Sequence, residues 1–283
     1  MLLFCAGTFL QACMDALAKW LGEDYTVWQV MAFRMGFGLL PAFLMLALRG
    51  QPLVPAMHRP LGHLWRGLFT AGAGLSFFYS LQFMSLAEAT AVFYVAPIIM
   101  YLFGFVFLRE TGGWVLALSV VFGFAGTLII YAPWSAPVGL GPAMALIGAV
   151  FYALSMVQIR KLAQTESSEA ILLYGTIVSM VVALFGAPFG WIAPSLPDLG
   201  LFLAMGLCGG FSIFFFASAL RYLSVVQAAN LEYTAIIWAI LIGFLVWQAV
   251  PDLRTGTGAA LITLAGVVAA IRMERDRAGS AGD

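Results

Sequence analysis

Hydrophobic residues fill long, nearly unbroken runs of the chain, and turn-forming residues separate one run from the next. Each run is about 20 residues long, the length that a helix needs to cross the hydrocarbon core of a bilayer. The separators are short and contain glycine or proline, as at Gly22, Gly112 and Pro251. The pattern predicts ten membrane-spanning helices, at residues 1–20, 26–49, 64–84, 86–108, 113–133, 138–160, 169–192, 199–220, 225–249 and 255–273.

The composition agrees with a membrane protein and excludes a water-soluble domain. The 283 residues are 63% hydrophobic and 9% charged, and the mean hydropathy is +1.00, whereas ordinary globular domains are about a quarter charged. Backbone groups in lipid must bond within their own segment, so long apolar runs form helices. We therefore expect an all-α integral membrane protein. The formal net charge of zero argues against nucleic acid as a partner.

Lysines and arginines near the span ends indicate the orientation of the chain. With a cytoplasmic N-terminus, ten of them lie on the cytoplasmic side: Arg49, Arg59, Arg66, Arg109, Arg160, Lys161, Arg221, Arg272, Arg275 and Arg277. Only Lys19 and Arg254 lie outside, and Arg34 falls within a span. The bias predicts that both termini are cytoplasmic. Residues 274–283 are charged and then rich in glycine and serine, so we expect a disordered cytoplasmic tail.

A stretch of the first half recurs in the second. Six positions of the stretch from Ser85 to Glu110 recur 139 positions later without a gap: Ser85, Ala89, Tyr94, Ala96, Gly104 and Phe105 match Ser224, Ala228, Tyr233, Ala235, Gly243 and Phe244. Since five spans per half is an odd number, the second copy must be inverted in the membrane. We predict two inverted-topology five-helix repeats, residues 1–133 and 138–273. Such repeats are typical of transporters that bind substrate near the midplane, between the halves.

Two runs carry a resemblance to a known family. They are FFYSLQFMSLAEATAVFYVAPIIMYLFGFVFLRE at Phe77 to Glu110 and FFFASALRYLSVVQAANLEYTAIIWAILIGF at Phe214 to Phe244. With ten spans in two halves, the chain resembles the EamA type of the drug/metabolite transporter superfamily. Its opening, from Met14 to Arg34, resembles one bacterial branch. One departure is visible: the family often repeats the acid that stands here at Glu110, but the ninth span ends in Trp247-Gln248-Ala249.

The resemblance implies a carrier in the bacterial inner (cytoplasmic) membrane that moves small organic metabolites by alternating access. It implies a drive by exchange or by protons, not ATP, and no cofactor. It favours export of aromatic or other neutral amino acids, and it leaves open the uptake of a nucleoside-like or vitamin-like compound. A lipid-modifying membrane enzyme would need clustered His, Asp or Glu near one interface, which the scattered acids do not supply. We expect no enzyme activity, and a monomer.

Ionisable residues inside spans are costly, so each is a functional candidate. Asp15 and Arg34 lie at similar depths in the first two spans, and they are candidates for coupling or gating. A structural ion pair is the alternative, either between those two or between Asp15 and Lys19, one helix turn apart. Glu232 lies about seven residues into the ninth span, where a desolvated carboxyl that exchanges a proton suits coupling. Its alternative is a structural bond to neighbours such as Asn230.

Polar aromatic residues mark a candidate cavity. Hydroxyls in a membrane core need partners, and a cavity of tyrosines and tryptophans suits an amphipathic substrate. The predicted cavity residues are Tyr79, Tyr94, Tyr101, Tyr152, Ser155, Tyr233 and Trp238. Packing is the alternative for each of them, because 14% of the chain is aromatic. Pro97, in mid-span, frees a backbone carbonyl and is a candidate hinge. The three cysteines and two histidines are scattered, so no metal site is expected.

Overall fold

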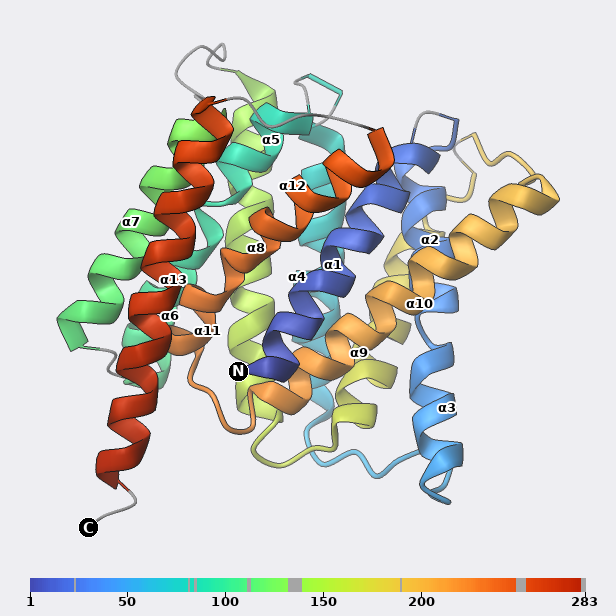
Figure 1. The fold of residues 1–283 in the computed structure, drawn as a ribbon. Coiled ribbons are helices and arrows are strands. Elements are labelled where there is room, and N and C mark those ends of the chain that lie inside the picture. Colours follow the sequence, from blue (N-terminus) through green and yellow to red (C-terminus); the bar gives the residue numbers. More distant parts are fainter. Residues whose placement is uncertain are drawn as a thin grey trace.

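The hydrophobic runs fold into helices joined by short turns in this computed structural model (Figure 1). It describes residues 1–22, 24–80, 82–83, 86–110, 113–131, 139–188, 190–247 and 253–280, and no strand occurs among them. The helices are α1 (Leu2–Leu21), α2 (Val27–Phe37), α3 (Leu40–Leu48), α4 (Pro60–Ser80), α5 (Leu86–Phe93), α6 (Ala96–Leu108), α7 (Gly113–Tyr131), α8 (Leu140–Leu162), α9 (Ser168–Leu184), α10 (Leu196–Ala219), α11 (Val225–Glu232), α12 (Thr234–Trp247) and α13 (Leu253–Ser280).

Seven helical stretches of the described residues are long and apolar enough to cross a membrane. They correspond to α1, α2 with α3, α7, α8, α10, α11 with the first part of α12, and α13. Two shorter apolar helices, α6 and α9, accompany them. The chain is therefore a multi-pass membrane protein. The second, fourth and ninth predicted spans are each made of two helices that meet at a break.

Three predicted boundaries are corrected. The third span was expected from residue 64, but α4 already begins at Pro60, which suits the first helical turn. The seventh was expected to reach residue 192, but α9 ends at Leu184, before Pro188 and before Gly190, whose φ is +77°. The tail was expected to be disordered from residue 274, but α13 continues to Ser280. Residues 274–278 are strong helix formers apart from one aspartate, and they extend an existing helix without a new nucleus. The predicted boundary at residues 133–138 and the Gln248-Ala249 departure lie outside the described residues.

The breaks in the fourth and ninth spans fall at repeat-related positions. The first break lies at Tyr94 and Val95, just before Pro97, which offers no N–H to the carbonyl of Phe93. The second lies at Tyr233, 139 positions later, where no proline occurs. There the N–H of Ile236 bonds the carbonyl of Tyr233 at 3.2 Å, three residues back instead of four. Discontinuous helices of this kind line substrate sites in transporters.

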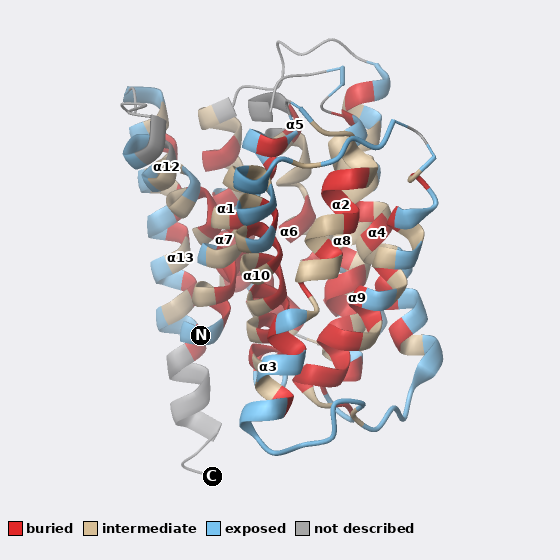
Figure 2. Cartoon of the chain, turned by 90° about the vertical axis from the view of Figure 1, so that its right-hand side faces the viewer, coloured by how far each residue is buried: buried red, intermediate tan, exposed pale blue. Residues whose placement is uncertain are grey.

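Helices of the first half pack mainly against helices of the second. The most extensive contacts of the described residues join α4 to α8, α1 to α10, and α7 to α13. Glycines permit the close approaches: a Cβ on Gly67 would lie 2.7 Å from the carbonyl oxygen of Gly175, and one on Gly206 would lie 2.9 Å from the amide nitrogen of Gly38. Gly67 and Gly206 are 139 positions apart, and each packs onto the second span of the opposite half. Buried residues follow these helices through the middle of the molecule (Figure 2).

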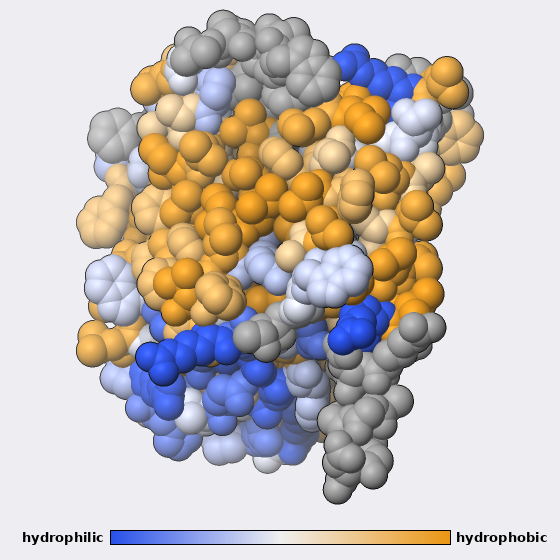
Figure 3. All heavy atoms as spheres, turned by 90° about the vertical axis from the view of Figure 1, so that its left-hand side faces the viewer, coloured by the Kyte–Doolittle hydropathy of each residue, from blue (hydrophilic) through white to orange (hydrophobic). Residues whose placement is uncertain are grey.

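The two ends of the molecule differ in polarity. Both termini lie toward the lower end of Figure 1, and α1 runs from there to the upper end. Figure 3 shows a broad apolar band, over the side where α7 and α13 lie, above a hydrophilic lower end. Exposed apolar side chains of α6, α7 and α13 include Phe105, Val106, Phe122, Leu264 and Val267. The band has the polarity expected of a surface that faces lipid.

Candidate functional site

A cavity of about 1110 Å³ lies between the two halves. Residues of α1, α2, α4, α5, α6, α8, α10, α11 and α12 line it, so both halves contribute to its wall. At the upper end it reaches Tyr25 and Thr26, between α1 and α2, and Gln82, beyond α4. At the other end it reaches Arg66 and Ile159. The cavity thus extends from the upper loops into the middle of the helix bundle.

Polar contacts join the two halves at the lower end. Arg49 pairs with Glu169 at 2.5 Å, and Arg160 pairs with Glu110 at 2.9 Å. Glu110 also accepts the backbone N–H of Val225, the first residue of α11, at 2.7 Å. These contacts connect α3 with α9, and the end of α6 with α8 and α11. They hold the two halves together at the lower end, away from the loops that the cavity reaches at the upper end.

Glu166, in the loop between α8 and α9, anchors the loop that precedes α4. Its buried carboxylate accepts the backbone N–H groups of His58 at 2.8 Å and Arg59 at 2.7 Å, and His63 lies 3.7 Å away. Burial by itself disfavours the ionised carboxyl. The N–H bonds from His58 and Arg59, the His58 ring and the charge of His63 outweigh burial and lower the pKa of Glu166. The ionised carboxylate therefore stabilises the contact between the α8–α9 loop and the loop that precedes α4.

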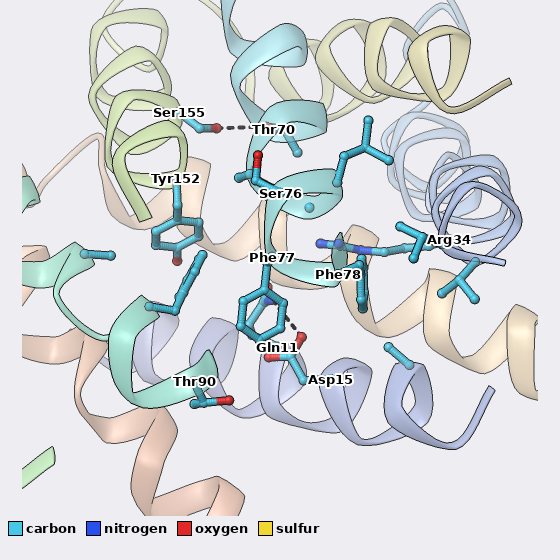
Figure 4. A pocket seen from close by; sticks show the side chains of 18 of the residues that line it. Gln11, Asp15, Arg34, Thr70, Ser76, Phe77, Phe78, Thr90, Tyr152 and Ser155 are labelled. Carbon is cyan, nitrogen blue, oxygen red and sulfur yellow. Dashed lines mark hydrogen bonds between the residues drawn. The ribbon is translucent and has the colours of Figure 1, made fainter. Parts of the chain in front are cut away.

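Asp15 and Arg34, the charged candidates of the first two predicted spans, reach into the cavity from α1 and α2 (Figure 4). Asp15 accepts a long bond of 3.4 Å from Gln11, and its side chain is exposed to the cavity. Arg34 lies beside Met31, with Nη1 3.8 Å from the thioether sulfur. No ion pair joins Asp15 to Arg34 in the part of the chain described, although their charges interact. A negative and a positive group are thus held in one cavity without neutralising each other by contact.

Glu232 and Tyr152 form a hydrogen-bonded pair on the cavity wall. Tyr152 donates to Oε1 of Glu232 at 2.5 Å. Glu232 is the last residue of α11, directly before the break at Tyr233, and it is 6% exposed. Its second oxygen is buried and has no hydrogen-bond partner among the described residues. The alternative expected from the sequence, a bond to Asn230, does not occur among the described residues: Tyr152 is the donor to Glu232, and the Asn230 amide donates to the carbonyl of Val226.

Aromatic and hydroxyl groups complete the wall. Tyr79, Tyr94, Tyr152 and Ser155 line the cavity, as does Pro97. Ser155 exchanges a hydrogen bond of 2.8 Å with Thr70 across α8 and α4, drawn in Figure 4. The Phe93 ring lies 5.0 Å from that of Phe77 and 5.5 Å from that of Tyr152. The cavity therefore offers aromatic surface beside its charged groups.

Tyr101, Tyr233 and Trp238 do not line the cavity, contrary to the sequence prediction. Tyr101 donates to the carbonyl of Gly113 at 3.2 Å, near the other end of α6. Tyr233 is 3% exposed and packs against Gly123, and Trp238 lies edge-on to Phe9 at 5.2 Å. The predicted stripe assumed one continuous helix in each span. Beyond the breaks, Ala96, Pro97, Ala235 and Ala239 line the cavity, whereas Tyr101 and Trp238 do not, so the breaks change which side chains face it.

Arg66 is the main cavity residue that the sequence reading missed, because it was assigned to a cytoplasmic loop. It lies in α4, is 1% exposed and lines the cavity. Its Nη1 donates to the backbone carbonyl of Ile171 at 2.6 Å. Pro60 was the available signal: a helix that starts at that proline places Arg66 nearly two turns inside. Gln11, Thr70, Phe77 and Phe78 also line the cavity without having been singled out.

Comparisons with known proteins identify a family. The sequence model of the EamA-like transporter family matches residues 1–132 and, separately, residues 139–271. A solved crystal structure superposes with a TM-score of 0.83 at 21% identity, covering 97% of each chain, which supports the fold.

The curated relatives with named functions are of two kinds. The pseudopaline exporter CntI of Pseudomonas aeruginosa strain PAO1 is 28% identical, over 98% of this chain and 96% of that protein. The S-adenosylmethionine uptake transporter of Rickettsia prowazekii is 25% identical over 248 residues, which cover 88% of this chain and 84% of that protein. The two relatives differ in cargo and in the direction of transport.

Proposed function

The chain belongs to the EamA-like transporter family, and we propose that it exports a zwitterionic metabolite with an amino-acid group through the cavity between its halves. One observation carries the proposal: Asp15 and Arg34 face the same cavity without an ion pair between them. An ammonium group suits Asp15, and a carboxylate suits the planar guanidinium of Arg34. A zwitterion satisfies both groups at once, whereas a simple amine or acid satisfies only one.

The remaining wall suits an apolar or aromatic side group. Tyr79, Tyr94 and Tyr152 contribute rings and hydroxyls, and Phe77 and Phe93 contribute aromatic faces. Cavities of 300–1,000 Å³ hold drug-sized ligands, so about 1110 Å³ has room for more than a small amino acid. Aromatic amino acids and larger amino-acid derivatives are the cargo class that this wall favours.

Alternating access by two inverted five-helix repeats is the proposed mechanism. It is supported by the two separate family matches, by the extensive contacts between halves, and by helix breaks at Tyr94 and Tyr233. Pro97 is the proposed hinge of the first break. The distribution of lysine and arginine supports cytoplasmic termini in a bacterial inner membrane. In that orientation the cavity reaches the outer side. A monomer suffices, since one chain supplies both halves of the wall.

Uptake of a nucleoside-bearing amino acid is the second candidate. The relative named as an S-adenosylmethionine uptake transporter, together with the cavity volume and its aromatic wall, favours it. S-adenosylmethionine also carries an amino-acid group, so Asp15 and Arg34 would serve both candidates. Adenine would stack on the aromatic rings. The two candidates differ in whether an amino acid without a nucleoside is transported.

Exchange in liposomes tests the proposal. Purified protein is reconstituted with unlabelled phenylalanine inside, and uptake of labelled phenylalanine is measured against phenylethylamine and phenylpropionate as competitors. We expect phenylalanine to exchange and the two single-charge analogues to compete at least tenfold more weakly. Asp15→Asn and Arg34→Gln should each reduce exchange at least tenfold, because each removes one charged contact.

Matched variants outside the cavity are the controls. Asp24→Asn and Arg59→Gln change exposed residues of the same types and should leave exchange unchanged. Equal competition by phenylethylamine would contradict the zwitterion proposal. Exchange of S-adenosylmethionine without exchange of phenylalanine would favour the second candidate.

A further inference from the structure

We propose that Arg66, together with Arg34, forms a second anion subsite at the inner end of the cavity, which binds an additional carboxylate of the cargo. The inference rests on the proposed function and narrows it. The cargo is then an amino-acid derivative with a second acidic group, carried as an anion.

Within the described part of the chain, Arg66 is a buried cation without an acidic partner. Its side chain is among the largest fully buried ones there, at 1% exposure. None of the ion pairs among those residues includes it. Among those residues, Arg66 donates one hydrogen bond, to the carbonyl of Ile171, and its Nε is buried without a partner. A guanidinium in a membrane bundle is costly unless an anion compensates it, so its persistence points to a ligand.

The acids nearest to the lower end of α4 do not neutralise Arg66. The Glu166 carboxylate already accepts hydrogen bonds from the backbone N–H groups of His58 and Arg59, and it contacts the His58 ring. Glu169 pairs with Arg49. A purely structural ion pair therefore does not explain why Arg66 is buried.

The fold leaves room for Arg66 by omitting a side chain on α9. A Cβ on Gly175 would lie 2.0 Å from Nη1 of Arg66 and 2.6 Å from its Cδ. The adjacent Gly67 lets α4 approach the carbonyl of Gly175 closely. The two glycines thus form a slot that holds the guanidinium between α4 and α9, at the end of the cavity.

Arg34 extends the subsite. It lines the same cavity as Arg66, and no ion pair among the described residues includes either guanidinium. The charges of Arg34 and Arg66 repel each other. An anion between them would remove this repulsion and give Arg66 an acidic partner.

Acid and amide pairs of equal shape test the subsite. The dissociation constant is measured for glutamate against glutamine, and for 2-aminoadipate against its side-chain amide, by isothermal titration to the purified full-length protein. In each pair the ligands differ only in the second acidic group. The wild type should bind at least one acid about tenfold or more tightly than its amide, because a charge-assisted bond to the guanidinium is lost with the amide.

Variants of the subsite should change this ratio. Arg66→Gln should bring it to about one, and Arg66→Lys should give an intermediate ratio, because lysine keeps the charge but cannot bond in a fork. Arg66→Lys also tests the subsite if Arg66→Gln does not fold. Arg59→Gln is the matched surface control and should keep the wild-type ratio.

Each outcome decides between the two proposals. Equal affinity for acid and amide in the wild type would overturn the subsite and leave the zwitterion proposal standing. So would a ratio that neither Arg66→Gln nor Arg66→Lys changes. Binding of none of the four compounds would overturn the subsite, and the exchange of phenylalanine then decides separately whether the proposed function stands. A preference that disappears in Arg66→Gln and persists in Arg59→Gln would support the subsite.

Discussion

Tyr94 and Tyr233 stack on each other, with ring centroids 6.4 Å apart and planes inclined by 21°. They are the matching residues of the two sequence repeats, and each stands at the break of its own span. In the proposed inverted repeat, matching residues meet only close to the axis that relates the two halves. The stacked pair is where we expect this axis to pass. Tyr94 faces the cavity, whereas Tyr233 is buried behind it.

Removing the Tyr233 hydroxyl should not destabilise the protein. The hydroxyl is buried without a partner among the described residues, and such a group costs about 1–3 kcal/mol. We expect Tyr233→Phe to keep or raise the free energy of unfolding, measured with denaturant in detergent. Tyr233→Ala also removes the stacked ring and should cost about 3–5 kcal/mol. A clear loss of stability in Tyr233→Phe would show that the hydroxyl has a partner.

The close contact at Gly67 should not tolerate a methyl group. A Cβ there would lie 2.4 Å from Cβ of Val178, so alanine must push α4 away from α9. We expect Gly67→Ala to lower the free energy of unfolding by about 1–3 kcal/mol. Gly200→Ala, in α10, is the matched control because a methyl group at that position would have no atom within 4 Å. It should be neutral or stabilising, since alanine favours helix. An equal loss in both variants would argue against steric overlap as the cause.

Pro97 should influence the rate of transport more than the affinity for cargo. Alanine at this position restores an N–H for the carbonyl of Phe93 and favours a continuous helix across Tyr94 and Val95. We expect Pro97→Ala to slow exchange in liposomes severalfold, with a smaller change in the dissociation constant. Pro60→Ala, at the exposed start of α4, should leave both unchanged. A change in affinity alone would argue against a hinge.

Glu232 is proposed as the group that couples transport to protons. Its buried carboxyl has one donor, Tyr152, and its other oxygen has no partner in the described part of the chain, an arrangement that favours a bound proton over an ionised group. We expect exchange by Glu232→Gln to be independent of an imposed pH gradient, with Asp24→Asn as the control that keeps the wild-type dependence. A gradient dependence that survives in Glu232→Gln would remove Glu232 from this role.

Acid should weaken the contact that Glu166 makes with the loop before α4. Because its pKa in the folded protein is below the ordinary value of 4.5, its ionised form contributes stability that is fully present above that value. This contribution is lost as the pH falls through the lowered pKa. We expect the unfolding temperature to drop less steeply with acid in Glu166→Gln than in the wild type. Parallel curves for the two proteins would show that Glu166 does not contribute to acid sensitivity.

The membrane class and much of the helix pattern follow from the order of the amino acids alone. Apolar runs of spanning length, breakers between them and a repeat offset of 139 are local or periodic properties, which need no knowledge of packing. Asp15, Arg34 and Glu232 were found for the same reason, since a charge within an apolar run is conspicuous wherever the run packs. The structure then brought Asp15, Arg34, Tyr152 and Glu232 to one cavity.

Which side chains reach that cavity depends on how the helices break and pack. The breaks at Tyr94 and Tyr233 change the direction of each helix face, so Tyr101 and Trp238 point elsewhere although their spacing fits a straight helix. Arg66 stands near a chain turn in sequence, yet the approach of Gly67 to Gly175 buries it between α4 and α9. A side chain's environment is set by the helices packed around it, and those helices come from distant parts of the chain.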